Sequence, residues 1–190
     1  MTDPSGIDPL VEGPRTRLRA LHPSEYRTVF AWYNDPELVS PFDRFSLDTF
    51  EGFVQDVESA SDDPRSLAPR FVIERREDGR LLGLLGHFTP HPVLSTVEVW
   101  YVMGAREERG KGYGSEAVRL LVDHLFRVLP IERVGAVCDA ENVPSVHLLE
   151  RVGLSLEGTL HRALFHHAVW HDVRVYGVTR SAWASRPTSA

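Results

Sequence analysis

The sequence predicts a mixed α/β (α+β) domain, with a mostly antiparallel central sheet of about seven strands flanked by about four helices. Segments with alternating apolar residues are interspersed with segments of helical periodicity. One Asp-Gly pair joins two apolar runs, and a glycine-rich turn leads directly into a long amphipathic segment. The expected order is strand, two helices, three strands, helix, strand, helix and two strands.

The first third of the chain predicts one strand and two helices. Residues 16–21 alternate as a short strand, and residues 22–34 follow as a helix that Asp35-Pro36 ends. A second helix is expected to begin with Ser46 as its N-cap. Its apolar face would carry Phe50, Phe53 and Val54.

The middle of the chain predicts a hairpin and a third strand. Asp78-Gly79 tolerates the positive φ of a tight turn between the two apolar runs. Residues 95–103, STVEVWYVM, form the clearest strand. Its alternation places Val97, Val99 and Tyr101 on one face and Glu98, Trp100 and Val102 on the other.

The last third predicts two helices and three strands. Apolar residues repeat at helical spacing from the glycines to Pro130, and residues 131–140 form a strand. Residues 141–153 form a short helix that Gly153 ends. Two final strands, at about 154–165 and 172–183, flank the turn HHAVWH.

Composition indicates one domain. A chain of 190 residues with 42% apolar content supports a single core. We expect residues 15–183 to form it, between flexible segments 1–14 and 184–190. The single Cys138 excludes an internal disulfide framework, and its apolar flanks indicate a buried structural thiol.

Charge and hydropathy exclude some partners. The net charge is −6, from 27 acidic and 21 basic residues, and there is no basic block, so we expect no nucleic-acid partner. The sequence shows neither a secretory leader nor an apolar run of membrane-spanning length. It therefore predicts a cytoplasmic protein without a membrane partner.

The stretch RGKGYGSEAVRLL, residues 109–121, places three glycines before a helix. Converging main-chain N–H groups and the positive end of a helix dipole suit a phosphate or pyrophosphate. A P-loop would need Ser or Thr where Gly112 stands, and a dinucleotide fingerprint would need glycine where Ser115 stands. A flexible turn before a helix is the simpler alternative.

These residues resemble the GNAT superfamily of acetyl-CoA-dependent N-acetyltransferases, whose pyrophosphate loop reads R/Q-x-x-G-x-G/A. Arg109, Gly112 and Gly114 match that loop. The resemblance covers about residues 15–183. Within the superfamily, the sequence is similar to the ribosomal-protein N-acetyltransferase (RimJ/RimL-like) branch. Its other motifs are NDPELV at 34–39, VEVWYVM at 97–103, Asn142-x-x-Ser145, ERVGL at 150–154, EGTL at 157–160 and WHDVRVYGV at 170–178.

The resemblance implies a sheet splayed at its centre, with a bulge near Val102 and Met103 that exposes main-chain groups to pantetheine. It implies acetyl-CoA as acyl donor. Amides of residues 110–115 would hold the pyrophosphate, Asn142 would contact pantetheine and Ser145 would lie near the thioester sulfur. The implied cofactor-binding residues are Val102, Met103, Arg109, Gly110, Lys111, Gly112, Tyr113, Gly114, Ser115, Asn142 and Ser145.

Glu98 and Ser145 are the catalytic candidates. A protonated amine must lose a proton to attack, and Glu98 beside Trp100 is placed to accept it, although a surface or ion-paired glutamate is the alternative. Leu149 stands where many members of the superfamily carry a Tyr that protonates the leaving thiolate. Ser145 or a water must then substitute, unless Ser145 is an ordinary first-turn residue and Asn142 only a cap.

Acceptor binding is expected in the two early helices and the final hairpin. Trp100 and the pair His171-Asp172, which the resemblance places near the acceptor, are the substrate-binding candidates. His161, His166, His167 and His171 lack the spacing and the paired Cys or acidic motif of a metal site, so no metal is expected.

Residues 43–63 carry a strongly acidic run. Such a run is usually a solvated helix face, and it would also steer cationic acceptors. Its members are Asp43, Asp48, Glu51, Asp56, Glu58, Asp62 and Asp63, against the single base Arg44.

The first functional hypothesis is an N-acetyltransferase that acts on a primary amine of a protein N-terminus or a small molecule. It would work by direct transfer in a ternary complex, as a monomer or homodimer. The alternative is a noncatalytic acyl-CoA-binding sensor or interaction domain, which the missing Tyr keeps open.

Overall fold

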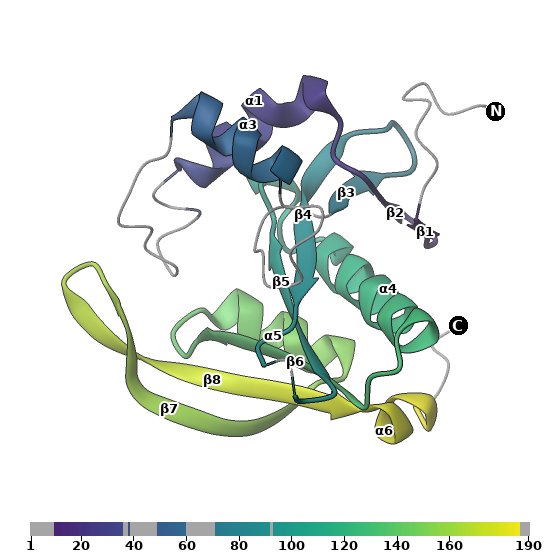
Figure 1. Cartoon of the computed structure of the whole chain (residues 1–190), viewed down its shortest axis with the longest axis vertical. Coiled ribbons are helices and arrows are strands. Elements are labelled where there is room, and N and C mark those ends of the chain that lie inside the picture. The colour runs from purple at the N-terminus through teal and green to yellow at the C-terminus, as the bar shows by residue number, and fades with distance from the viewer. Residues whose placement is uncertain (1–9, 36–37, 39–48, 60–70, 92, 187–190) are drawn as a thin grey trace.

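An eight-stranded sheet runs through the molecule in the order β1-β2-β3-β4-β5-β6-β8-β7 (Figure 1). The computed structural model describes residues 10–35, 38, 49–59, 71–91 and 93–186. Neighbouring strands pair antiparallel except β5 and β6, which are parallel. The predicted mixed α/β class and the mostly antiparallel sheet are confirmed, with one more strand than expected.

The extra strand lies at the N-terminal edge. β1 (Val11–Glu12) pairs with β2 (Thr16–Arg19), inside a segment for which the sequence indicated no fixed structure. Glu116 from the distant helix α4 accepts hydrogen bonds from the main-chain N–H groups of Arg15 and Thr16, each at 2.8 Å. This tertiary contact holds the edge in place.

Two early helices follow β2. A 3-10 turn, η1 (Pro23–Glu25), leads into α1 (Tyr26–Tyr33), and α3 spans Phe50–Ser59. The hydroxyl of Thr49 accepts the N–H of Gly52 at 3.0 Å at the start of α3. The expected N-cap, Ser46, lies outside the described residues.

The central strands agree with the prediction. β3 (Phe71–Arg75) and β4 (Leu81–Phe88) form the expected hairpin, and Gly79 in its turn has a φ of +73°. β5 (Thr96–Val102) pairs with β4.

A parallel crossover follows. The short η3 (Arg106–Glu108) precedes α4 (Tyr113–Val128), which leads to β6 (Arg133–Asp139). The next helix, α5 (Val143–Val152), ends at Gly153, whose φ of +106° suits glycine at a helix stop.

The C-terminal hairpin differs from the prediction in its turn and its end. β7 (Ser155–His166) and β8 (Val169–Thr179) are joined by only two residues, His167 and Ala168, whose positive φ values match the right-handed twist of the strands. A final helix, α6 (Arg180–Ala184), replaces the expected strand end. The hydroxyl of Thr179 caps it by accepting the N–H of Ala182 at 3.2 Å, so the strand cannot continue.

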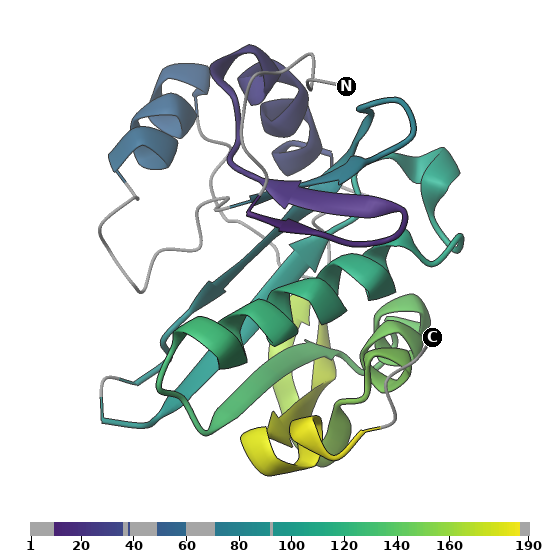
Figure 2. The ribbon, with the colours of Figure 1, turned by 90° about the vertical axis from the view of Figure 1, so that its right-hand side faces the viewer.

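Helices cover both faces of the sheet (Figure 2). The larger apolar cluster joins α4 and α5 to one face and includes Val97, Val99 and the buried Cys138. A smaller cluster joins α1 and α3 to the other face and includes Trp100 as a half-buried neighbour. The two faces predicted for β5 are therefore confirmed. In the described part of the chain, the helices are too short or too polar to traverse a bilayer.

The sheet opens between its two parallel strands. β5 and β6 pair over Thr96–Glu98 and Arg133–Gly135 only. Beyond this region, the upper part of the sheet with β4 and β5 turns away from β6, β8 and β7 (Figure 1). The predicted splay at the centre of the sheet is confirmed.

Candidate active site

The glycine loop reaches α4 at the open end of β5. Gly110 and Gly112 have φ values of +75° and +88°, which favour glycine, and a Cβ on Gly110 would meet no atom within 4 Å. Gly112 is the N-cap of α4 and has no side chain to accept the first-turn N–H groups. These N–H groups and the helix dipole form an environment that fits a pyrophosphate.

Contacts within the protein hold this loop in shape. Arg109 donates through Nε to the carbonyl of Met103 at 2.9 Å, and the Lys111 ammonium pairs with the buried Glu108 carboxylate at 2.9 Å. Arg15, which the sequence did not single out, donates to the Lys111 carbonyl at 3.1 Å. Its guanidinium also lies 4.7 Å from the ring centroid of Tyr113. These contacts preorganise the main chain of the loop.

Gly114 is set by packing. A Cβ there would lie 3.0 Å from Cδ1 of Leu148 and 3.2 Å from Sδ of Met103. The next residue, Ser115, is buried. Glycine at this position lets the first turn of α4 approach both α5 and the end of β5.

The β4–β5 ladder is irregular just past Val102. The register pairs Leu84 with Val102, which would bring Leu82 opposite Gly104. Instead, the N–H of Ala105 bonds to the carbonyl of Leu82 at 2.9 Å. The chain after β5 therefore carries one extra residue opposite β4, as in a β-bulge. This irregularity lies where the resemblance implied a bulge at Val102 and Met103.

Glu98 lies half-buried on β5, on the same face as Trp100. Burial raises the pKa of its carboxyl group, and the charge of Arg133 opposes that effect. Within the described residues Glu98 has no ion-pair partner. Its carboxylate is therefore a stronger base than an exposed glutamate.

Trp100 crosses over Gly86 on β4. A Cβ on Gly86 would lie 2.7 Å from the indole ring, so the glycine makes room for it. The indole Nε1 is buried and has no hydrogen-bond partner among the described residues. A buried N–H of this kind can donate a hydrogen bond to an oxygen or nitrogen atom of a bound substrate.

Ser145 and Asn142 lie at the start of α5. Asn142 caps the helix, because its Oδ1 accepts the N–H of Ser145 at 3.1 Å. The hydroxyl of Ser145 lies 2.6 Å from that of Tyr101 on β5. Burial raises the pKa of Tyr101 well above its ordinary value, so it stays a protonated donor. Leu149, where many superfamily members carry Tyr, is fully buried in the core.

Tyr101 was not among the predicted site residues. The available signal was its place on the helix-covered face of β5, where a buried hydroxyl needs a hydrogen-bond partner. Its partner on α5 lies 44 residues away in sequence and could not be read from local pattern.

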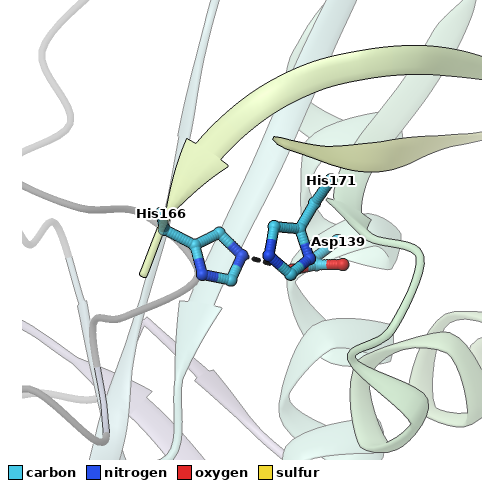
Figure 3. Close-up of side chains that lie close together, drawn as sticks. All are labelled: Asp139, His166 and His171. Atoms are coloured by element: carbon cyan, nitrogen blue, oxygen red, sulfur yellow. Dashed lines mark hydrogen bonds and ion pairs between the residues drawn. The ribbon is translucent and has the colours of Figure 1, made fainter. Parts of the chain in front are cut away.

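The structure separates the predicted pair His171 and Asp172. The Asp172 carboxylate accepts the N–H of Arg162 at 2.8 Å and lies 2.9 Å from Nδ1 of His161, and these two contacts lower its pKa. His171 instead lies with Asp139 and His166 (Figure 3). The sequence shows no metal-site motif around the histidines, but strand pairing brings Asp139 to them from 27 residues before His166.

Part of the acidic run is described. Glu51, Asp56 and Glu58 are exposed along α3. α3 packs on the same face of the sheet as Trp100, so these charges lie on the side of Glu98. The other members of the run, and part of the motif at 34–39, lie outside the described residues: Pro36, Glu37, Val39, Asp43, Arg44, Asp48, Asp62 and Asp63.

A cavity of about 460 Å³ lies on the α1 side of the loop before α4. None of the predicted catalytic or cofactor residues lines it. The described lining consists of Thr28, Trp32, Asp35, Arg80, Leu81, Gly104, Ala105, Arg106 and Glu107. The glycine loop itself is open, so the predicted site and this cavity are different places.

A family model described as an acetyltransferase (GNAT) domain matches residues 15–155. The chain belongs to the GNAT acetyltransferase family. YoaA of Bacillus subtilis (strain 168), named an uncharacterized N-acetyltransferase, is 25% identical over 175 residues, or 90% of this chain and 97% of YoaA.

Solved structures share the GNAT fold. The Vibrio cholerae spermidine N-acetyltransferase in complex with CoA and spermine has a TM-score of 0.79 and 23% identity, covering 91% of this chain and 100% of that one. Mycobacterium smegmatis RimJ in complex with CoA-disulfide has a TM-score of 0.72 and 23% identity, covering 91% and 86%.

Family membership establishes the general activity. This GNAT chain is an acetyl-CoA-dependent N-acetyltransferase, and the transfer needs no metal. Acetyl-CoA supplies an activated acetyl thioester. The glycine loop, its uncapped helix start and the open sheet beside it fit such a ligand.

Proposed function

We propose that this protein acetylates a primary amine of a cationic small molecule or a protein N-terminus, by direct transfer from acetyl-CoA. The proposal depends on one juxtaposition. The half-buried Glu98 lies on the strand that ends beside the glycine loop, at the opening between β5 and β6. An amine in that opening would have a base on one side and the cofactor loop on the other.

Glu98 is proposed as the base. An amine is protonated at neutral pH and must lose a proton before it can form a bond to carbon. The raised pKa of Glu98 matches it better to that proton than an exposed carboxylate would be. The proton passes from the amine to Glu98, directly or through water.

Ser145 is proposed as the proton donor to the sulfur, with Tyr101 behind it. The Tyr101 hydroxyl lies 2.6 Å from the Ser145 hydroxyl and is kept protonated by burial. When Ser145 passes its proton to the sulfur, the Tyr101 proton can move along this hydrogen bond to Ser145, and water returns a proton to Tyr101 before the next turnover. This pair would substitute for the Tyr that is absent at Leu149.

The proposed acceptor is cationic. The described acidic residues of α3 lie on the side of the sheet that carries Glu98, and the whole chain has a net charge of −6. Such a field raises the local concentration of polyamines or basic peptides. The RimJ/RimL-like motifs favour protein N-termini within this class, and the spermidine N-acetyltransferase neighbour favours polyamines.

The test is product analysis after incubation with acetyl-CoA. Spermidine, other diamines and peptides with different N-terminal residues are offered, and free thiol and acetylated product are measured together. We expect stoichiometric thiol release and a singly acetylated amine with a cationic acceptor. Binding of acetyl-CoA without thiol release, across the panel, would instead indicate the noncatalytic sensor.

Replacing Tyr101 with phenylalanine is expected to lower kcat by about tenfold, with little change in the KM for acetyl-CoA. The substitution removes only the hydroxyl that supports Ser145. Steady-state kinetics over a range of pH measures the effect. Tyr176→Phe is the matched control and should keep the wild-type rate, because its hydroxyl is fully buried and bonds to Glu150 rather than to Ser145. A wild-type rate in Tyr101→Phe at every pH would remove the pair from the mechanism.

A further inference from the structure

Three side chains from three strands meet near the tip of the final hairpin. Asp139 ends β6, His166 ends β7 and His171 lies in β8 (Figure 3). Nε2 of His166 is 2.6 Å from Oδ2 of Asp139, and Nδ1 of His171 is 3.3 Å from the same oxygen. One candidate ligand atom from each residue lies within 4.8 Å of the other two.

The cluster is buried and incompletely satisfied. Asp139 and His166 are 3% and 6% exposed, and the side chain of His171 is 10% exposed. Nδ1 of His171 is a buried atom that has no hydrogen-bond partner among the described residues. It lies 3.3 Å from Asp139 Oδ2 and also 3.3 Å from Oε2 of Glu141. A buried nitrogen that lies between two carboxylate oxygens without a hydrogen bond to either one favours a cation that binds all three atoms.

The donor set and spacing fit a divalent transition metal. Imidazole nitrogen and carboxylate oxygen are ligands of Zn²⁺ and similar ions, with bonds of about 2.0–2.2 Å. Tetrahedral bonds of this length separate neighbouring ligand atoms by about 3.3 Å. The two distances at His171 have this value, and the hydrogen bond between His166 and Asp139 would open by less than about 1 Å.

Neighbouring groups already orient the candidate ligands. Oδ1 of Asp139 accepts the N–H of Glu141 at 2.8 Å, which leaves Oδ2 to face the histidines. Nδ1 of His166 lies 3.0 Å from Nδ1 of His167, which fixes the ring with Nε2 toward Asp139. Such outer contacts are typical of metal sites. The two ligand rings stack, with centroids 3.7 Å apart and planes at 16°, so one ring must rotate for both nitrogens to point at a single ion.

We propose that Asp139, His166 and His171 bind one divalent transition-metal ion of the zinc class, with Glu141 or water completing the coordination. Glu141 is largely exposed and can turn toward the ion. The ion would reinforce the junction between the end of β6 and the β7–β8 hairpin, which strand pairing and the His166–Asp139 hydrogen bond already connect. Acetyl transfer needs no metal, so the site has a structural role.

Calorimetric titration of chelator-treated, tag-free protein with ZnCl₂ at neutral pH tests the proposal. We expect one Zn²⁺ per chain, and a Kd at least about tenfold weaker in His171→Ala and in Asp139→Asn. Asparagine at 139 keeps an oxygen for the N–H of Glu141, so the fold should survive. His161→Ala, on the same hairpin and bonded only to Asp172 among the described contacts, is the matched control and should bind as the wild type does.

Thermal unfolding provides a second readout that does not depend on activity. Zn²⁺ should raise the midpoint of the wild type and of His161→Ala by similar amounts, and that of His171→Ala and Asp139→Asn by less at the same concentration. Mg²⁺ should have no effect, because it prefers oxygen ligands. Absence of binding in the wild type, or equal binding in all four proteins, would overturn the proposal.

Discussion

Replacing Gly112 with aspartate is expected to weaken acetyl-CoA binding by at least about a hundredfold, a loss of about 2.7 kcal/mol. The new carboxylate would stand at the N-cap of α4, where it can accept the first-turn N–H groups that are proposed to hold the pyrophosphate. It would also repel the phosphates. The substitution therefore places an internal anion where the external one should bind.

The fold should tolerate this change. A Cβ at Gly112 would lie 3.1 Å from Nη2 of Arg15, the movable end of a half-exposed side chain. The φ of +88° imposes a strain of about 1–2 kcal/mol on any non-glycine residue, which the helix-capping carboxylate partly offsets.

The matched control is Gly79→Asp. Gly79 has a φ of +73° and open space around its Cβ, so it adds the same charge with a similar strain but lies in the β3–β4 turn. Calorimetry with CoA and acetyl-CoA should show wild-type affinity for this control. If Gly112→Asp also bound CoA normally, the main chain of residues 110–115 would not be the pyrophosphate site.

Replacing Glu98 with glutamine is expected to lower kcat/KM for the amine by about a hundredfold near neutral pH. In the wild type, the rate should fall as pH drops through the raised pKa of Glu98, because the protonated carboxyl cannot accept a proton. Without this base, the rate should instead rise with pH until the amine deprotonates by itself, at about 8 to 10.4. The difference between the two proteins should therefore shrink at high pH.

Kinetics over a range of pH, with acetyl-CoA affinity measured separately, checks this result. The affinity should be unchanged, because Glu98 is not part of the glycine loop. Glu77→Gln, an exposed change of the same charge in the β3–β4 turn, is the control and should keep the wild-type profile. Parallel pH profiles in Glu98→Gln and the wild type would exclude Glu98 as the base.

Stability gives an independent check on the same residue. A carboxyl group whose pKa is raised in the folded state binds its proton more tightly there than in the unfolded chain. Its contribution to stability is present below the unfolded pKa and is lost as pH rises through the folded pKa. Glu98→Gln should therefore unfold at a slightly higher temperature than the wild type at neutral pH, and a loss of activity could not be ascribed to misfolding.

Local sequence determined most of the secondary structure. The Asp78-Gly79 turn, the two faces of β5 and the stop at Gly153 follow from short-range conformational preferences, which neighbouring residues set. The predictions of secondary structure were wrong where a tertiary contact determines the local conformation. β1 is held by Glu116 of α4, and α6 forms because Trp183 packs in the core and donates to Asp123 at 2.6 Å.

The sequence by itself also determined the glycine loop and the place of Glu98, because both are contiguous with the strand that leads into α4. Only the tertiary structure decided which distant groups complete the site. In the folded chain, Tyr101 contacts Ser145 and Arg15 contacts the carbonyl of Lys111. The side chain of His171 contacts Asp139 and does not act as a pair with Asp172. These contacts depend on strand order and register across the whole sheet, and such long-range pairing leaves no periodic signal in the residues themselves.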